Sequence, residues 1–329
     1  MHPSAIVVRL RSSVRLDRYL TGRLPHVSRN RIQRHIEQGD VLVDGRRVRA
    51  SHRLHGGETL TLPPFEARQR DVASQPVELC IVHEDRDVIV VDKQAGLLVH
   101  PSGEEYQRTL LNGLHCELAA RGENAGGLGI VHRLDRWTSG LIVVAKCLQA
   151  RRDLSGQVEA RRVRRRYIGI VHGQPRADRG CVELSIRRDP RRPTRMQALD
   201  ARGVADVERS GWDWHVSASG YSDPRRDLRP RHARTHYRLL RRLRGASLLR
   251  FELETGRTHQ IRVHMQGLGT PLVGDPIYGA ADDRLDLSRP ALHASALEFT
   301  HPSTGERLRF RAPLPADLLA LIAKLDPRG

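Results

Sequence analysis

The chain has 329 residues, of which 56 are lysine or arginine and 38 are aspartate or glutamate, so its net charge is +18. This length can bury a full core and suggests two domains. With 39% hydrophobic and 29% charged residues, the composition argues against both a membrane protein and a chain too polar to fold. Apolar runs stay well short of the ~20 residues that cross a bilayer, so we expect a cytoplasmic protein without a membrane segment.

The positive charge is almost entirely arginine, because lysine occurs only at Lys93, Lys146 and Lys324. An excess of this size suits a polyanionic partner, since neutralising phosphate groups releases counterions. A genome biased towards arginine codons would explain the preference for arginine over lysine, but not the excess over acidic residues. The four cysteines are far apart and form no CxxC pair, so we expect reduced thiols and no metal site.

Residues 13–62 predict a small module of two helices followed by a hairpin. Apolar residues at helical spacing predict the first helix, and a second is expected over residues 29–37, capped by Ser28. Asp44 and Gly45 then form a strong hairpin-turn signal after a short alternating strand. This pattern leaves five arginines facing the solvent: Arg29, Arg31, Arg34, Arg46 and Arg47.

This order of elements resembles the S4 RNA-binding module, a likeness carried by Leu16-Asp17, Ser28-Arg29, Ile36, Gly39, the run from Val41 to Gly45, and Gly57-Glu58. The resemblance implies that the helix and hairpin contact an RNA backbone, and it assigns RNA binding to Arg29, Arg34 and Arg46. The alternative is a solvated basic face with no ligand. The proline-containing, polar residues 63–76 predict a linker.

Strand-like runs dominate residues 77–325, which we expect to form a second, larger domain. The runs are Val88 to Val91, Leu97 to Val99, Leu128 to Val131, Leu141 to Ala145 and Leu248 to Leu253, and a helix is expected over residues 108–121. No GxGxxG, Walker loop or GxSxG elbow occurs in this part of the chain. Nucleotide cofactors and serine-hydrolase chemistry therefore lose most of their support.

Asp135 follows an apolar run and precedes another, in a polar turn between residues 131 and 139. A carboxylate at the mouth of two buried strands is held rigidly, as catalysis requires. An aspartate in such a turn is more commonly a turn residue that bonds its own backbone. The turn by itself leaves both interpretations open.

The string His132-Arg133-Leu134-Asp135, followed by Thr138-Ser139-Gly140, resembles the signature of the RluA-type pseudouridine synthases. Further blocks typical of that family occur in order: Asp92-Lys93, Gly96-Leu97, His100-Pro101, Arg165-Arg166-Tyr167, the run from Thr255 to His264, Gly274-Asp275, Tyr278-Gly279, Leu292-His293-Ala294 and His301-Pro302. The resemblance spans about residues 80–315. It implies an α+β protein: an S4-like domain followed by a mixed, mostly antiparallel β-sheet with flanking helices.

The resemblance also implies site residues. It makes Asp135 the catalytic carboxylate, Arg262 the guanidinium paired with it, and Tyr167 the aromatic that stacks on the target base and can take part in removing the C5 proton. Arg133 matches the residue that fills the place of the flipped base, and Arg257 is a second candidate for the pairing arginine. Phosphate binding is the alternative role for Arg262 and Arg257.

Converting uridine to pseudouridine breaks the N1–C1′ bond and joins C5 to C1′ without gain or loss of atoms, so we expect no cofactor. Asp135 can serve as nucleophile or as charge stabiliser, and the sequence does not choose between these routes. The expected partner is RNA: large-subunit (23S) ribosomal RNA first, transfer RNA second, bound by a monomer. One competing hypothesis is a non-catalytic RNA-binding or ribosome-assembly protein. Another is a basic hydrolase that uses Asp135 with a histidine, for which the sequence offers neither a nucleophile motif nor a metal site.

Two features depart from the family pattern. Trp137 stands where the family commonly has a small or acidic residue, and it would either widen the RNA-stacking surface or pack against a neighbouring strand. Residues 202–232 form an apparent insertion that contains Trp212 and Trp214. Long loops in compact domains are commonly functional or disordered, so we expect this one to extend the RNA contact surface.

Overall fold

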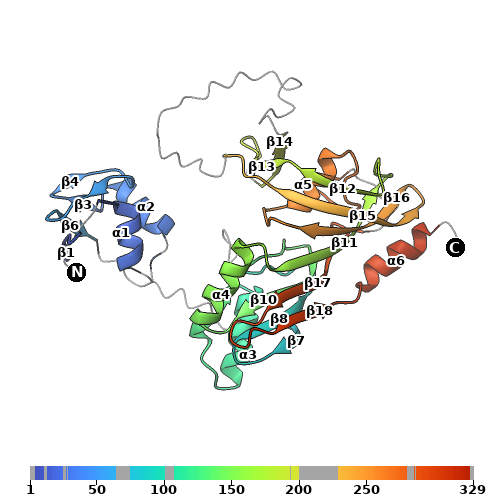
Figure 1. The fold of residues 1–329 in the computed structure, drawn as a ribbon, viewed down its shortest axis with the longest axis horizontal. Coiled ribbons are helices and arrows are strands. Elements are labelled where there is room, and N and C mark those ends of the chain that lie inside the picture. Colours follow the sequence, from blue (N-terminus) through green and yellow to red (C-terminus); the bar gives the residue numbers. More distant parts are fainter. Residues whose placement is uncertain are drawn as a thin grey trace, which may run out of the picture. The chain divides into compact units, whose positions relative to one another are not determined.

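The computed structural model describes residues 4–10, 13–24, 27, 29–63, 75–100, 107–192, 194–199, 229–279, 285 and 287–326 (Figure 1). The chain forms two compact units, one within residues 1–71 and the other within residues 72–215 and 227–329. The expected linker lies outside the described residues except for positions 63, 75 and 76, and the expected insertion does so except for positions 229–232.

The first unit contains two helices and short strands, in the predicted order. A four-stranded sheet has the order β1-β6-β3-β4, and β2 pairs with β5. The elements are β1 (Ser4–Val7), β2 (Val14–Arg15), α1 (Leu16–Arg23), α2 (Arg29–Gln38), β3 (Leu42–Val43), β4 (Arg46–Arg47), β5 (Arg53–Leu54) and β6 (Thr59–Leu62).

A small apolar core and one tight turn, both encoded in the local sequence, determine the fold of this unit. Leu20 of α1 and Ile32 of α2 are fully buried in the same cluster, so the helices pack through their apolar stripes. Asp17 accepts a hydrogen bond from Gln33 Nε2 at 2.7 Å, which ties the two helices together. At the hairpin, Asp44 (φ 47°) is left-handed like the glycine after it, which confirms the predicted two-residue turn.

The second unit is built on a ten-stranded sheet with the order β12-β15-β16-β11-β17-β10-β8-β7, in which β18 also pairs with β17 and β9 with β10. Only the β10–β17 pair is parallel among these described strands, which confirms the predicted mixed, mostly antiparallel sheet. The strands are β7 (Cys80–Glu84), β8 (Val88–Lys93), β9 (Gly129–Ile130), β10 (Ser139–Ala145), β11 (Arg164–His172), β12 (Arg179–Glu183), β15 (Arg234–Leu243), β16 (Ala246–Leu253), β17 (Leu292–Thr300) and β18 (Arg307–Arg311).

Helices cover both faces of this sheet (Figure 1). On β8, Ile89 and Val91 belong to the core that contains α3 and α5, whereas Val88 and Val90 belong to the core that contains α4. Successive side chains of β8 therefore point to opposite faces of the sheet, and each face has its own hydrophobic core. The helices are α3 (Leu110–Ala120), α4 (Leu148–Glu159), α5 (Gln260–Gly267) and α6 (Ala316–Leu325), and a separate hairpin consists of β13 (Ser185–Arg188) and β14 (Met196–Leu199).

Strand β10 lies inside the sheet, and all seven of its residues are buried. Its parallel pairing with β17 begins at Ser139 and Gly140. Gly140 has φ of 109°, and a Cβ there would lie 2.3 Å from the carbonyl oxygen of Ala294. Only glycine allows this close approach, which explains the glycine that ends the Thr138-Ser139-Gly140 block.

The expected strand over residues 97–99 is wrong. Leu97 and Val99 are buried, but the segment is irregular because its carbonyl groups hold the start of α3. Leu110 N–H donates to the Leu98 carbonyl at 2.7 Å. Short apolar runs do not separate a buried strand from a buried loop, and this one satisfies a helix terminus instead of a sheet.

Within the described ranges, no helix combines the length and the apolar character that a membrane span requires.

Candidate active site

The loop of residues 131–138 joins β9 to β10 and carries Asp135. Leu134 is buried in the core beneath it, and the carboxylate of Asp135 remains 17% exposed. The loop is therefore anchored by an apolar side chain next to a partly accessible carboxylate. This placement satisfies the requirement for a rigidly held acid at the mouth of two strands.

Lys93, at the end of β8, fixes the other side of this loop. Its side chain is fully buried, and Nζ donates to the carbonyl oxygens of Gln94 (2.9 Å), Leu97 (2.9 Å) and Arg136 (3.1 Å). Burial lowers the pKa of Lys93 to about 7, whereas the negative charge of Asp135 acts in the opposite direction. A compact ammonium with three donors suits this site better than a planar guanidinium.

A cavity of about 640 Å³ lies beside the loop, within the range of ligand pockets. Its walls come from the 131–138 loop, the end of α4, β11, and the segment that joins β16 to α5. Five of the residues assigned from sequence line this one cavity: Asp135, Tyr167, Arg262, Arg133 and Arg257.

Arg262, on α5, has an exposed fraction of 4% and lies between two carboxylates. Its Nε and Nη2 donate to the two oxygens of Asp275, both at 2.7 Å, and its Nη1 lies 3.6 Å from Asp135 Oδ2. Burial alone would lower the pKa of Arg262, but the hydrogen bonds and charge of Asp275, with the charge of Asp135, raise it overall. The guanidinium therefore stays charged and presents one edge to Asp135.

Asp275 and Tyr278 position this guanidinium. The Asp275 side chain is fully buried, and its Oδ1 also accepts hydrogen bonds from the backbone N–H groups of Ile277 and Tyr278. The Tyr278 ring lies 5.0 Å from Arg262 Cζ, in the range of a cation–π contact. Burial raises the pKa of Tyr278 to about 12, so its hydroxyl is a donor, and it lies 2.8 Å from His259 Nδ1.

Tyr167 projects from β11 into the same cavity and is 5% exposed. It also belongs to the core cluster that contains α3 and α5, so packing fixes the ring on one side. Burial raises the pKa of Tyr167, and the charge of Asp135 adds to this effect. The hydroxyl is therefore protonated at neutral pH.

The remaining sequence-assigned arginines fall into two groups. Arg133 is exposed at the cavity, and Arg257 is half-buried there, with its Nε donating to the His232 carbonyl at 3.1 Å. Arg34 on α2 and Arg46 on β4 belong to the first unit and are exposed. Arg29 lies in α2, but its side chain is outside the described part of the chain.

Trp137 is 45% exposed, although Gly96 lies close to one edge of its ring. The Arg136 guanidinium lies 5.7 Å from the ring centroid. The Trp137 side chain therefore packs against the loop after β8 with one edge, and part of its ring stays exposed to solvent.

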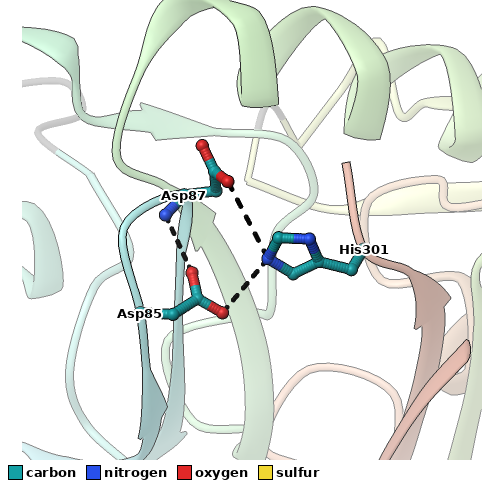
Figure 2. Close-up of side chains that lie close together, drawn as sticks. All are labelled: Asp85, Asp87 and His301. Atoms are coloured by element: carbon teal, nitrogen blue, oxygen red, sulfur yellow. Dashed lines mark hydrogen bonds and ion pairs between the residues drawn. The ribbon is translucent and has the colours of Figure 1, made fainter. Parts of the chain in front are cut away.

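One cluster outside the cavity has residue types that bind metals. Asp85, Asp87 and His301 bring potential ligand atoms within 4.8 Å of one another (Figure 2). His301 Nδ1 accepts hydrogen bonds from the backbone N–H groups of Ser303 and Thr304, so the ring proton lies on Nε2, which faces Asp85 Oδ2 at 3.2 Å. Because that nitrogen has no free lone pair, the cluster is a hydrogen-bonded junction between the β7–β8 and β17–β18 turns.

Comparison with known protein families shows to which family the chain belongs. The family model described as RNA pseudouridylate synthase matches residues 87–267, which include the 131–138 loop, β11 and α5. The chain belongs to the RNA pseudouridylate synthase family. An S4 domain model matches residues 14–60, which confirms the identification of the first unit.

Individual relatives agree with this family assignment across nearly the whole chain. An uncharacterised RNA pseudouridine synthase of Chloroflexus aurantiacus is 43% identical and covers 98% of this chain and 94% of its own length. The ribosomal large subunit pseudouridine synthase D of Pseudomonas aeruginosa is 39% identical and covers 94% of this chain and 92% of its own. Among solved structures, human RNA pseudouridylate synthase domain containing 1 has a TM-score of 0.57 at 25% identity, covering 77% of this chain and 91% of that one.

Sequence reasoning assigned no role to three residues that hold the 131–138 loop or Arg262 in place: Lys93, Asp275 and Tyr278. The sequence did contain a signal for Lys93, because lysine occurs at only three positions in this arginine-rich chain and one of them is position 93. Asp275 and Tyr278 stood in motif blocks without an assigned partner. Their role depends on a loop 13 residues after Arg262 folding back onto α5, which only the tertiary structure provides.

Proposed function

We propose that this enzyme converts uridines of large-subunit ribosomal RNA to pseudouridine, with Asp135 as the catalytic carboxylate. The observation that carries this proposal is the pairing of a partly exposed aspartate with a buried arginine in a cavity that also holds an aromatic side chain. A scaffold protein that only binds RNA would not require all three groups in one cavity.

Arg262 presents a fixed positive charge to Asp135, because its Nη1 lies 3.6 Å from Asp135 Oδ2. Asp275 holds Arg262 by two hydrogen bonds of 2.7 Å, so the guanidinium is oriented before the substrate enters. The carboxylate then acts either as a nucleophile at the sugar or base, or as a stabiliser of positive charge on the sugar.

Tyr167 and Arg133 serve the nucleotide on its way into the cavity. A uridine in a helix or structured loop must leave its stack to reach Asp135. The Tyr167 ring offers a fixed stacking surface, which holds a base without selecting the surrounding sequence. Arg133 is exposed next to the cavity, where a planar guanidinium can stack in the space that the base vacates.

Two observations favour ribosomal RNA over transfer RNA. The relatives from Nitrosomonas europaea and Pseudomonas aeruginosa, both 39% identical, are named ribosomal large subunit pseudouridine synthase D. The S4 domain adds a second basic unit, which suits docking on a large folded RNA. We further propose that the enzyme acts as a monomer in the cytoplasm, since Asp135, Tyr167 and Arg262 of one chain already line one cavity.

The test is pseudouridine mapping in ribosomal and transfer RNA from a strain that lacks the gene. We expect one or more sites to vanish from large-subunit ribosomal RNA and to return with the wild-type gene, but not with Asp135→Asn. If pseudouridines vanish from transfer RNA alone, the substrate is transfer RNA and not ribosomal RNA. If no pseudouridine vanishes from either RNA, the proposal of an enzyme is refuted. Restoration by Asp135→Asn would refute the role of that aspartate.

A further inference from the structure

Arg165 is a buried arginine on β11 that the mechanism above does not use. Its exposed fraction is 6%, and it lines the catalytic cavity two residues before Tyr167. The Arg165 Nε is buried and has no hydrogen-bond partner in the described part of the chain. Within the same described residues, no carboxylate lies within ion-pair distance of its guanidinium.

A buried cation without a partner is unfavourable for the free protein, because desolvation is not offset by a hydrogen bond or a counter-charge. Arg262 in the same cavity has the usual compensation for a buried arginine, because its Nε and Nη2 donate hydrogen bonds to the two carboxylate oxygens of Asp275. The Nε of Arg165 lacks such a partner among the described residues, although Arg165 lines the cavity. A ligand that brings negative charge into the cavity would supply what the protein does not.

A second unpaired donor lies nearby. Val143 N–H donates to His132 Nε2 at 3.2 Å, so the proton of this neutral histidine lies on Nδ1. That Nδ1 is buried without a partner among the described residues, and His132 also lines the cavity. Burial first, and then the positive charge of Arg165, lowers the pKa of His132 to about 3. Two unsatisfied donors therefore belong to one wall of the cavity.

Among the described residues, the carboxylates that line the cavity make no ion pair with Arg165. Asp135 faces Arg262, and Glu254 is bonded by Arg161 and His236. Arginines outnumber carboxylates in the lining: Arg133, Arg161, Arg165, Arg257 and Arg262, against Asp135, Glu159 and Glu254.

Gly256 leaves the guanidinium accessible from the cavity. This residue lies in the segment between β16 and α5, and a Cβ at its position would be 2.7 Å from Arg165 Nη1. A glycine at this place therefore gives the guanidinium its room. Since the φ of Gly256 does not lie in the left-handed region, alanine is compatible with its backbone and would displace only the Arg165 side chain.

We propose that Arg165 binds a backbone phosphate adjacent to the target uridine, and so holds the flipped nucleotide with its base against Tyr167. A phosphate brings the missing charge, and its oxygens match the planar donors of a guanidinium. Arg165 is thus a substrate-binding residue of the reaction proposed above, and this inference rests on that proposed function.

The test uses a synthetic RNA hairpin that contains a uridine identified by the mapping experiment. Affinity is measured in the Asp135→Asn background, so turnover does not alter the RNA. We expect Arg165→Gln to weaken binding by roughly ten-fold and to reduce the log–log salt slope by about 1. Arg164→Gln is the matched control, because Arg164 is the next residue on β11, is exposed and does not line the cavity; we expect its affinity to stay within about two-fold of the parent.

A chemical change in the RNA identifies the contact. Neutral methylphosphonates replace, one at a time, the phosphates on either side of the target uridine. We expect one of these replacements to lower the RNA affinity of the parent enzyme by a similar factor. The same replacement should not lower the affinity of Arg165→Gln further, since that variant has already lost the interaction. Equal losses in both proteins at every position would overturn the proposal.

Stability separates binding from a structural role. Removing an unpaired buried charge does not destabilise the free enzyme, so we expect Arg165→Met to have an unchanged or higher melting temperature while it loses RNA affinity. Gly256→Ala should show the same loss of affinity with Arg165 still present. A lower melting temperature with normal RNA binding would overturn the proposal. A mapping experiment that finds no modified uridine would refute the proposed function, whereas unchanged affinity of Arg165→Gln for RNA with a mapped uridine would refute only the role of Arg165.

Discussion

The bond between Arg262 and Asp275 offers the sharpest test of how this site is held together. Replacing Asp275 by asparagine keeps the size of the side chain but removes its charge. The asparagine oxygen can still accept from the turn formed by Ile277 and Tyr278. Its amide group, however, would face Arg262 Nε, so two donors would meet where a hydrogen bond of 2.7 Å now exists.

The expected magnitude follows from burial. Both partners are nearly inaccessible, with exposed fractions of 4% for Arg262 and 0% for Asp275. Removing one member of a buried ion pair costs about 3–5 kcal/mol. We expect the lower end, about 3 kcal/mol, because Asp135 lies 3.6 Å from Arg262 and partly replaces the lost charge. For a unit of this size, that corresponds to roughly 6–12 °C in the melting temperature.

Activity should fall further than stability alone explains. Without Asp275, the guanidinium is free to turn towards Asp135 and to pull the carboxylate out of position. A displacement of about 1 Å at a catalytic group can lower the rate by roughly a hundred-fold. We therefore expect a large decrease in kcat, measured by single-turnover formation of pseudouridine at temperatures where the variant is folded.

The matched control is Asp178→Asn. Asp178 also pairs with an arginine, Arg242, but their exposed fractions are 68% and 57%. An exposed pair contributes about 0–1 kcal/mol, so this variant should melt within a few degrees of the wild type and keep its activity. Equal melting temperatures for Asp275→Asn and Asp178→Asn, measured by calorimetry, would refute the reasoning.

Three further outcomes are expected. Tyr167→Ala should weaken binding of the target RNA by about 1–3 kcal/mol while Tyr167→Phe retains it, and equal affinities in a titration would contradict stacking. Burial lowers the pKa of His264 to about 4, below its unfolded value of about 6.5, so stability should fall between pH 6.5 and 4 as the unfolded chain takes up a proton. His264→Asn should flatten that slope in urea denaturation. Arg34→Gln and Arg46→Gln should each reduce the log–log salt slope of RNA binding by about 1, and unchanged slopes would exclude their phosphate contacts.

The linear sequence by itself determined the class of protein and the two helices and hairpin of the first unit. Helix periodicity and the Asp44-Gly45 turn are local signals, so both helices and the hairpin of the S4 unit could be predicted. Strand β1, which pairs with β6, lies before the expected start at residue 13 and was missed. Recognition of the pseudouridine synthase signature likewise depends on runs of adjacent residues, such as those around Asp135. These features are fixed by neighbours in the chain and need no knowledge of packing.

Only the tertiary structure decided which side chains complete the site. Lys93 holds the carbonyl of a residue 43 positions away, and the bond between Arg262 and Asp275 requires a loop to return to its helix. The missing partner of Arg165 is likewise a property of its surroundings, since its sequence neighbours are also arginines. Strand alternation places Arg165 on the same face as Tyr167 and Arg164 on the other face, but burial and charge compensation are set by residues distant in the chain.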